Sequence, residues 1–428
     1  MKLLPVAVVM VLLATAVGVG MAPIVTDSGG EEQPDPEAFS PSYATASTAE
    51  LENEQSSEQN VINVLSLPSD SIERSDVRRQ YADLGPAAGF DTDGTTTQLV
   101  TRSLAADLEA ADDSERQALL EEELEEIEDE VETLESEEQI AIGAFSNGEL
   151  EPRELLVELA AIHQSAGTLE ERIQVVDSYA ETLEQTDSSD RLETLEYDLR
   201  MLKGPMRAHA VSVLRGERPA TRVMIETGNG EIALSAIDDD VYIREINRKG
   251  LRGDGQNTLA DDRAAELTEQ QYPLLWNQSA EWNLDISTSE SVFVMSVPFP
   301  GGELQTFLDG ASEQTFIEHQ KIPLGIVETG ESTSKVQDGL NVTVDQTYAG
   351  GPLRVTVTDA ENDEPVGATV TVGQEGQESQ SVGTVDENGV VWAVSPREQF
   401  TITVLGEGTS AAFVDIDPPS PESVTGRE

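Results

Sequence analysis

The stretch "LLEEELEEIEDEVETLESEE", Leu119 to Glu138, contains twelve acidic residues among twenty and no basic residue. Alternating steps of four and three residues separate its apolar positions, which are Leu120, Leu124, Ile127, Val131 and Leu134. This 4-3-4-3 spacing is typical of a helix that buries one narrow apolar stripe against a neighbouring helix. The stretch therefore predicts a helix with a covered stripe and an acidic remaining surface.

The same spacing recurs further along the chain, in two later groups: Leu169, Ile173, Val176, Ala180 and Leu183, and then Leu192, Leu195, Leu199 and Leu202. Turn residues in "FSNGELEPREL" and "TDSSD" separate the groups. We therefore expect residues 61–216 to form an antiparallel helical bundle or coiled-coil hairpin. A single extended dimeric coiled coil is the alternative. The leading part, "NVINVLSLPSDSIERSDVRRQYADLG", predicts a short apolar run and one helix.

The charge of the whole chain indicates the solvent in which it works. It has 83 acidic and 25 basic residues in 428, a formal net charge of -58, and only five of the basic residues are lysines. Five like-charge pairs at i,i+4 spacing in the opening stretch would cost about 1–2.5 kcal/mol in dilute buffer. Molar salt reduces the screening length to about 3 Å and removes most of this repulsion. The composition therefore predicts a halophilic protein, with an acidic binding protein from an ordinary cell as the alternative.

The N-terminal sequence "MKLLPVAVVMVLLATAVGVGMAP" predicts export. Lys2 precedes an apolar run from Leu3 to Val19, and small residues follow. Residues 1–22 are therefore expected to be a secretory signal peptide or a retained N-terminal membrane anchor. Residues 23–60, rich in Ser, Glu, Pro and Gly, predict a disordered acidic spacer. The chain has no cysteine, which excludes disulfides, thiolate metal sites and cysteine nucleophiles.

After residue 217 the apolar period changes to two. "RVMIETGNGEIALSAIDDDVYIREI" predicts strands joined at tight turns, "NTLADDRAAELTEQQYPLLW" a helical segment, and "EWNLDIS", "SVFVMSVPF", "LQTFL" and "QTFIEHQ" further strands. We expect a small α+β domain at residues 218–328. A linker is predicted at 329–338, seven short strands of a β-sandwich at 339–417, and a polar tail at 418–428.

The predicted sandwich resembles carboxypeptidase regulatory-like, transthyretin-type domains. The likeness rests on "VTD" from Val357, on "PVGATV" from Pro365 and on "GTVDENG" from Gly383. It implies an accessory, non-catalytic module. The full layout is similar to a family of exported haloarchaeal proteins of unknown function, through "NVINVLSLPSDSIERSDVRRQYADLG", "AIGAFSNGELEPRELLVELAAIHQSAGTLEERI" and "LRMLKGPMRAHAVSVLRGE". That resemblance implies an archaeal envelope setting and no catalytic residue. Many members carry a C-terminal anchor, which we do not expect here.

Three short motifs raise chemical possibilities. "DTDGT" from Asp91 resembles a phosphatase motif or the start of a calcium loop, but no buried strand precedes it and the other calcium ligands are missing. We interpret it as a turn that caps a helix. Asp238–Asp240 is predicted to be a polar hairpin tip rather than a cation site, and Arg252-Gly253-Asp254 a loop rather than an adhesion site.

No residue is assigned a catalytic, cofactor or metal role. The three histidines, His163, His209 and His319, are widely spaced, and His163 and His209 lie in helical patterns that favour packed or surface positions. No recognised hydrolase, metalloprotease or nucleotide-binding motif occurs. Asn277 and Asn341 begin N-glycosylation sequons, which the export signal makes candidate modification sites.

The sequence thus favours a non-catalytic structural or binding protein of the cell envelope or surface. Partners are unknown, with cell-surface proteins or glycans as possibilities, and membrane attachment through the N-terminal segment is another. Nucleic acid is excluded as a partner because no stripe of Lys and Arg is present. Two alternatives stay open: a secreted hydrolase that uses carboxylates in residues 218–328, and a membrane-anchored sensor or chaperone ectodomain.

Overall fold

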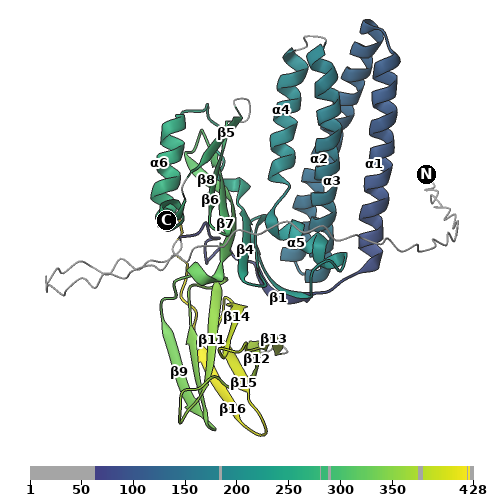
Figure 1. The fold of residues 1–428 in the computed structure, drawn as a ribbon. Helices are drawn as coiled ribbons and strands as arrows, with labels where there is room; N and C mark the ends of the chain where they lie inside the picture. The colour runs from purple at the N-terminus through teal and green to yellow at the C-terminus, as the bar shows by residue number, and fades with distance from the viewer. Residues whose placement is uncertain are drawn as a thin grey trace, which may run out of the picture. The chain divides into compact units, whose positions relative to one another are not determined.

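The computed structural model describes residues 63–182, 186–279, 281–287, 291–374, 379–421 and 423–424. The predicted signal segment and spacer, residues 1–60, lie outside the described residues. Figure 1 shows helices, a large sheet and two smaller sheets in chain order. The predicted fold class, a helical bundle followed by an α+β domain and a β-sandwich, is confirmed.

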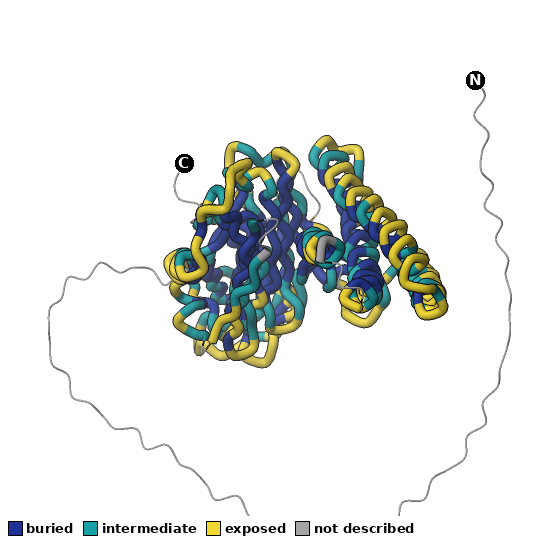
Figure 2. Tube along the Cα trace, turned by 90° about the horizontal axis from the view of Figure 1, so that it is seen from above, coloured by how far each residue is buried: buried dark blue, intermediate teal, exposed yellow. Residues whose placement is uncertain are grey.

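Five helices form the first part of the structure: α1 (Leu84–Ala110), α2 (Asp113–Ser146), α3 (Pro152–Thr182), α4 (Thr186–Met201) and α5 (Pro205–Leu214). Helix α3 packs against α1, α2, α4 and α5. Buried residues line the facing sides of the helices and exposed residues line the outer sides (Figure 2). The alternative of one extended helix pair is wrong for the described residues, because α2, α3 and α4 fold back on one another.

The acidic stretch lies within α2, and its local sequence explains where the helix begins. Asp112 accepts from the backbone of Glu115 while the Glu115 side chain accepts from the Asp112 backbone, which forms a capping box. The whole apolar stripe of the stretch is buried against α3 and α4. Arginines cover part of the acidic surface: Arg172 pairs with Glu126 at 3.0 Å and Glu130 at 2.9 Å, and Arg191 with Glu121 and Glu128 at 2.8 Å.

The start of the described chain differs from its prediction as helix. Residues Arg74–Gln80 form strand β1, which pairs antiparallel with β2 (Thr221–Gly228). Val64, Leu65 and Leu67 are buried among residues of the sheet. The strand forms because β2 offers an unpaired edge, and this tertiary pairing outweighs the local preference. The middle domain therefore includes residues from the segment that we assigned to the helical domain.

Eight antiparallel strands make up the large sheet, in the order β1-β2-β3-β4-β8-β7-β6-β5. The remaining strands are β3 (Glu231–Asp238), β4 (Val241–Asn247), β5 (Asn283–Ser287), β6 (Val292–Phe299), β7 (Gly302–Asp309) and β8 (Gln314–Pro323). One face packs against α2, α3 and α5, and the other against α6 (Asp261–Gln271) and α7 (Pro273–Gln278). Two short 3-10 helices, Lys249–Leu251 and Leu324–Ile326, complete the domain.

Two four-stranded sheets form the sandwich: β14-β11-β10-β9 and β13-β12-β15-β16. The strands are β9 (Ser332–Gln337), β10 (Leu340–Asp345), β11 (Pro352–Asp359), β12 (Thr369–Gln374), β13 (Gln380–Thr384), β14 (Val390–Val394), β15 (Phe400–Leu405) and β16 (Ala411–Ile416). All seven predicted strands are present. Their alternating apolar residues, such as Val355 and Ile402, are fully buried between the sheets.

One prediction at the ends of the sandwich is wrong. The linker at 329–338 contains β9, an edge strand whose polar side chains gave no apolar signal. It forms a hairpin with β10 through Asp338 and Gly339, whose φ angles of 48° and 81° suit a tight Asp-Gly turn. The polar tail also takes part in the structure, because Ser423 forms a parallel bridge with Val64.

Candidate functional site

A pocket lies between the helical bundle and the helix-facing side of the large sheet. It encloses about 230 Å³. Its lining residues are His163, Arg200, Lys203, Gly204, Pro205, Ala208, Glu303, Gln305, His319 and Lys321. We call it the basic pocket. Residues from α3, α4, α5, β7 and β8 meet there, so the pocket exists only because the bundle docks on the sheet.

The lining concentrates lysine and histidine residues in a strongly acidic chain. Two of the five lysines, Lys203 and Lys321, and two of the three histidines line the basic pocket. Arg200 is paired with Asp285 at 2.6 Å, and Lys203 with Glu170 at 2.5 Å. Among the described residues, Lys321 forms no ion pair. Among the lining cations, Lys321 is therefore the one best able to form an ion pair with a negatively charged ligand.

The two histidines of the basic pocket are neutral at ordinary pH. Burial lowers the pKa of His163 to about 4, against the opposing charge of Glu245. Burial, together with the charges of Arg207 and Lys321, lowers the pKa of His319 to about 3. His319 Nδ1 lies 3.2 Å from Gln305 Oε1, whereas His163 Nδ1 is buried with no hydrogen-bond partner in the part of the chain that the structure describes. His163 thus offers a free polar atom beside the cations.

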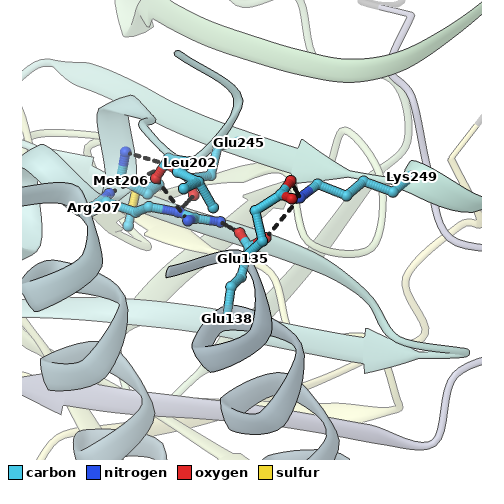
Figure 3. A network of polar contacts seen from close by, with 7 residues as sticks. All are labelled: Glu135, Glu138, Leu202, Met206, Arg207, Glu245 and Lys249. Atoms are coloured by element: carbon cyan, nitrogen blue, oxygen red, sulfur yellow. Dashed lines mark hydrogen bonds and ion pairs between the residues drawn. The ribbon is translucent and has the colours of Figure 1, made fainter. Parts of the chain in front are cut away.

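A buried charge network holds the wall of the basic pocket in place (Figure 3). Arg207 donates to Glu245 at 2.9 Å, to Glu138 at 2.5 Å and to the Leu202 carbonyl at 2.8 Å. Lys249 reaches Glu138 at 3.3 Å. Burial alone would raise the pKa of Glu138, but the charges of Arg207 and Lys249 outweigh burial and lower it. The network therefore consists of charged partners that compensate one another.

The same network positions the turn before α5. The Glu245 carboxylate accepts from the backbone N–H groups of Met206 at 2.9 Å and Arg207 at 3.2 Å, which satisfies the start of the helix. A Cβ atom on Gly204 would lie 2.1 Å from Glu245 Oε2, so any other residue at this position would displace the Glu245 carboxylate from the network. Lys203, Gly204 and Pro205 are consequently fixed as one wall of the basic pocket.

The lining supplies groups that can bind an anion. It contains one carboxylate, Glu303, and no hydroxyl or thiol side chain among the described residues. A hydrolase with paired carboxylates needs two acids at the same cleft, and a triad needs a nucleophile beside its base. Neutral histidines, a glutamine and an unpaired lysine can instead hydrogen-bond and neutralise an anionic group.

The structure places the motifs of the sequence analysis elsewhere. "DTDGT" lies inside α1, which begins after the N-cap Asp83, so the predicted turn is wrong; Asp91 is exposed and pairs with Arg215 at 3.0 Å. Asp238–Asp240 forms the predicted hairpin tip between β3 and β4. The Arg252–Asp254 segment is the predicted loop, in which Gly253 N–H donates to Asp309 at 3.0 Å.

The two sequon asparagines occupy different settings. Asn277 is exposed in the short helix α7. Asn341 is half-buried in β10, between β9 and β11. Among the described residues, no group of three or more His, Asp or Glu side chains is placed to hold a metal ion. No described helix is both long enough and apolar enough to span a membrane.

Sequence reasoning did not bring His163, His319, Lys203 and Lys321 together. His163 and His319 are 156 positions apart, and each looked isolated in its own segment. One signal could have pointed to the site: lysine is so scarce that "LKGP" at Lys203 and "HQK" ending at Lys321 stand out.

The fold and the basic pocket define a modular protein, in which a helical bundle and an antiparallel sheet enclose a site suited to binding and a β-sandwich follows them in the chain. Comparison with family models places it more closely. Residues 1–219, more than half of the chain, match the model described as a domain of unknown function (DUF7096), and the chain belongs to this family. Residues 223–328 match a family of unknown function (DUF7094).

The sandwich has its own match. Residues 331–413 match an archaeal fibronectin-III type-like domain, whereas the sequence motifs resembled carboxypeptidase regulatory-like domains; the β-sandwich fits both descriptions. No curated protein and no solved structure matches the chain.

Proposed function

We propose that this protein is an exported, non-catalytic binding protein of the archaeal cell envelope, which holds a small anionic ligand, or an anionic group of a larger surface partner, in the basic pocket. The observation that carries the proposal is the lining itself. A chain with five lysines and a net charge of -58 gathers two lysines, an arginine and two neutral histidines around one cavity that has no nucleophile among the described residues.

The export part of the proposal rests on sequence. The N-terminal apolar run with Lys2, the acidic composition suited to molar salt, and the match of the sandwich to an archaeal domain support a haloarchaeal envelope protein. We expect an antibody against the native chain to detect it in the envelope or culture medium after cell fractionation. Detection solely in the cytosolic fraction would contradict export while leaving the binding proposal standing.

The binding part is tested by replacing Lys321 with methionine. Lys321 is exposed and forms no ion pair among the described residues, so Lys321→Met should leave folding unchanged and remove one charged hydrogen-bond donor from the ligand. A charge-assisted hydrogen bond is worth about 1.5–3 kcal/mol, so affinity should fall about tenfold or more. Isothermal titration calorimetry in molar sodium chloride with inorganic phosphate, sulfate and glucuronate measures this change.

Lys335 provides the matched control, because it is an exposed lysine on β9 of the sandwich. Lys335→Met should bind like the unaltered protein. Since the pKa values of His163 and His319 are about 4 and 3, affinity for sulfate, whose own charge is constant over this range, should stay flat from neutral pH down to about pH 5. Failure of all three probes to bind, or equal losses in both lysine variants, would remove the basic pocket from the proposal.

A further inference from the structure

Two arginines lie directly opposite each other at the edge of the large sheet. Arg79 on β1 and Arg222 on β2 are cross-strand partners in the antiparallel register. Like charges at such positions destabilise a strand pair. The chain has 83 acidic residues that could have stood opposite an arginine. The pairing of two arginines at this position therefore calls for an explanation.

Arg222 differs from the other buried arginines of the described chain. Only 9% of it is exposed, and its Nε and Nη1 atoms have no hydrogen-bond partner among the described residues. The remaining buried arginines each bind a carboxylate: Arg172 binds Glu123, Arg207 binds Glu138, Arg244 binds Glu318 and Arg248 binds Glu231. Leaving a guanidinium buried without a counter-charge costs several kcal/mol.

A cavity of about 190 Å³ borders this arginine pair, where the sandwich meets the sheet. Its walls include Arg79, Thr221, Arg222, Val382 and Trp392. We call it the junction pocket. Arg79 Nη2 donates to the Ser381 carbonyl of β13 at 2.7 Å, which holds that guanidinium at the junction.

Two acids also line the junction pocket, and Asp238 Oδ1 is buried with no hydrogen-bond partner among the described residues. Asp238 lies 3.6 Å from His209 and 3.4 Å from Arg218, and Asp239 lies 3.5 Å from Arg218. No ion pair joins either acid to Arg222 within the described residues. Burial and the neighbouring charge of Arg79 lower the pKa of Arg222 to about 10, as expected for a guanidinium that lacks a carboxylate partner.

We propose that the junction pocket is a second binding site, distinct from the basic pocket, in which Arg222 and Arg79 bind a small oxyanion. A guanidinium presents donors in a planar fork that matches the oxygens of phosphate, sulfate or a carboxylate. The bound anion supplies the missing counter-charge to Arg222. Because the pocket walls come from both the sheet and the sandwich, the anion also ties the two domains together.

The decisive variant is Arg222→Met, which keeps much of the side-chain length and removes the charge. Unfolding temperatures are measured in molar sodium chloride with and without millimolar inorganic phosphate. The unaltered protein should gain several degrees with phosphate, because a ligand that binds the folded state stabilises it. Arg222→Met should melt above the unaltered protein when phosphate is absent. Its gain on adding phosphate should be smaller than that of the unaltered protein, and should vanish when Lys321→Met is combined with it.

Arg78→Met is the matched control, because Arg78 is the adjacent, exposed residue of β1 and pairs with Asp76 at 3.4 Å. It should retain the phosphate response, as should Lys321→Met, which separates this site from the basic pocket. A second measurement follows the fluorescence of Trp392 during a phosphate titration. It uses a variant in which Trp276 and Trp282 are replaced by phenylalanine. Arg222→Met should weaken phosphate binding at least tenfold in that titration.

Three results would overturn the proposal. One is a protein with no phosphate-dependent change in melting or Trp392 emission. Another is an Arg222→Met variant that binds phosphate as before. The third is an Arg222→Met variant that melts below the unaltered protein when phosphate is absent. That result would mean that an acidic part of the chain itself neutralises Arg222.

Discussion

Replacement of Arg207 by methionine is expected to lower the free energy of unfolding by about 3–5 kcal/mol. The guanidinium is 2% exposed and binds Glu138, Glu245 and the Leu202 carbonyl. Without it, two buried carboxylates lose their principal partner, and an uncompensated buried charge is far more costly than a missing surface pair. Thermal or urea-induced unfolding in molar sodium chloride measures the loss.

Arg153→Met is the control for this prediction. Arg153 also pairs with a carboxylate, Asp83, but its side chain is 65% exposed, so the loss should stay below about 1 kcal/mol. Neutralising the two abandoned acids in Arg207→Met/Glu138→Gln/Glu245→Gln should recover part of the stability. If Arg207→Met unfolds within 1 kcal/mol of the unaltered protein, the network does not stabilise the docking of the bundle on the sheet.

The second large effect that we expect is a loss of stability when the salt concentration is lowered. Transfer from molar sodium chloride to about 10 mM extends the screening length to about 30 Å and restores repulsion among the carboxylates. On α2 the arginines neutralise Glu121, Glu126, Glu128 and Glu130, while Glu125 and Asp129 are both exposed and form no ion pair among the described residues. We expect a loss of about 0.2–0.5 kcal/mol from the Glu125/Asp129 pair and more from the whole chain.

The matched variants separate charge screening from a general effect of salt on stability. Glu125→Gln/Asp129→Asn removes a like-charge pair, so it should stabilise the protein in dilute buffer and do little in molar salt. Glu128→Gln removes a partner of Arg191 and should not stabilise. Equal unfolding temperatures in dilute buffer and in molar salt would contradict the halophilic interpretation.

The sequence predicted well the helices and strands whose apolar residues recur at a short, regular spacing. The stripe from Leu120 to Leu134 encodes α2, and the alternation at Leu353, Val355 and Val357 encodes β11, because each element buries its own apolar residues. The Asp338-Gly339 turn was a readable hairpin signal that we assigned to a linker.

Other features depend on partners distant in sequence. Strand β1, "RSDVRRQ", has only Val77 and Gln80 buried, so nothing local distinguishes it from a helix. The basic pocket and the Arg79–Arg222 pair arise only when α3, β8 and β1 meet residues more than 100 positions away. Contacts between such distant segments leave no periodic pattern in the sequence. A single sequence therefore does not predict these sites.

The position of β1 in the sheet has a consequence for biosynthesis. Its pairing partner β2 begins 141 residues after β1 ends, and the segment that contains β1 belongs to a different family match from the rest of the sheet. At ribosomal rates of about 5–20 residues per second, β1 waits about 7–30 seconds for its complement. Because β1 lies in one matched region and completes the sheet of the other, we expect the two regions to unfold together rather than as separate domains.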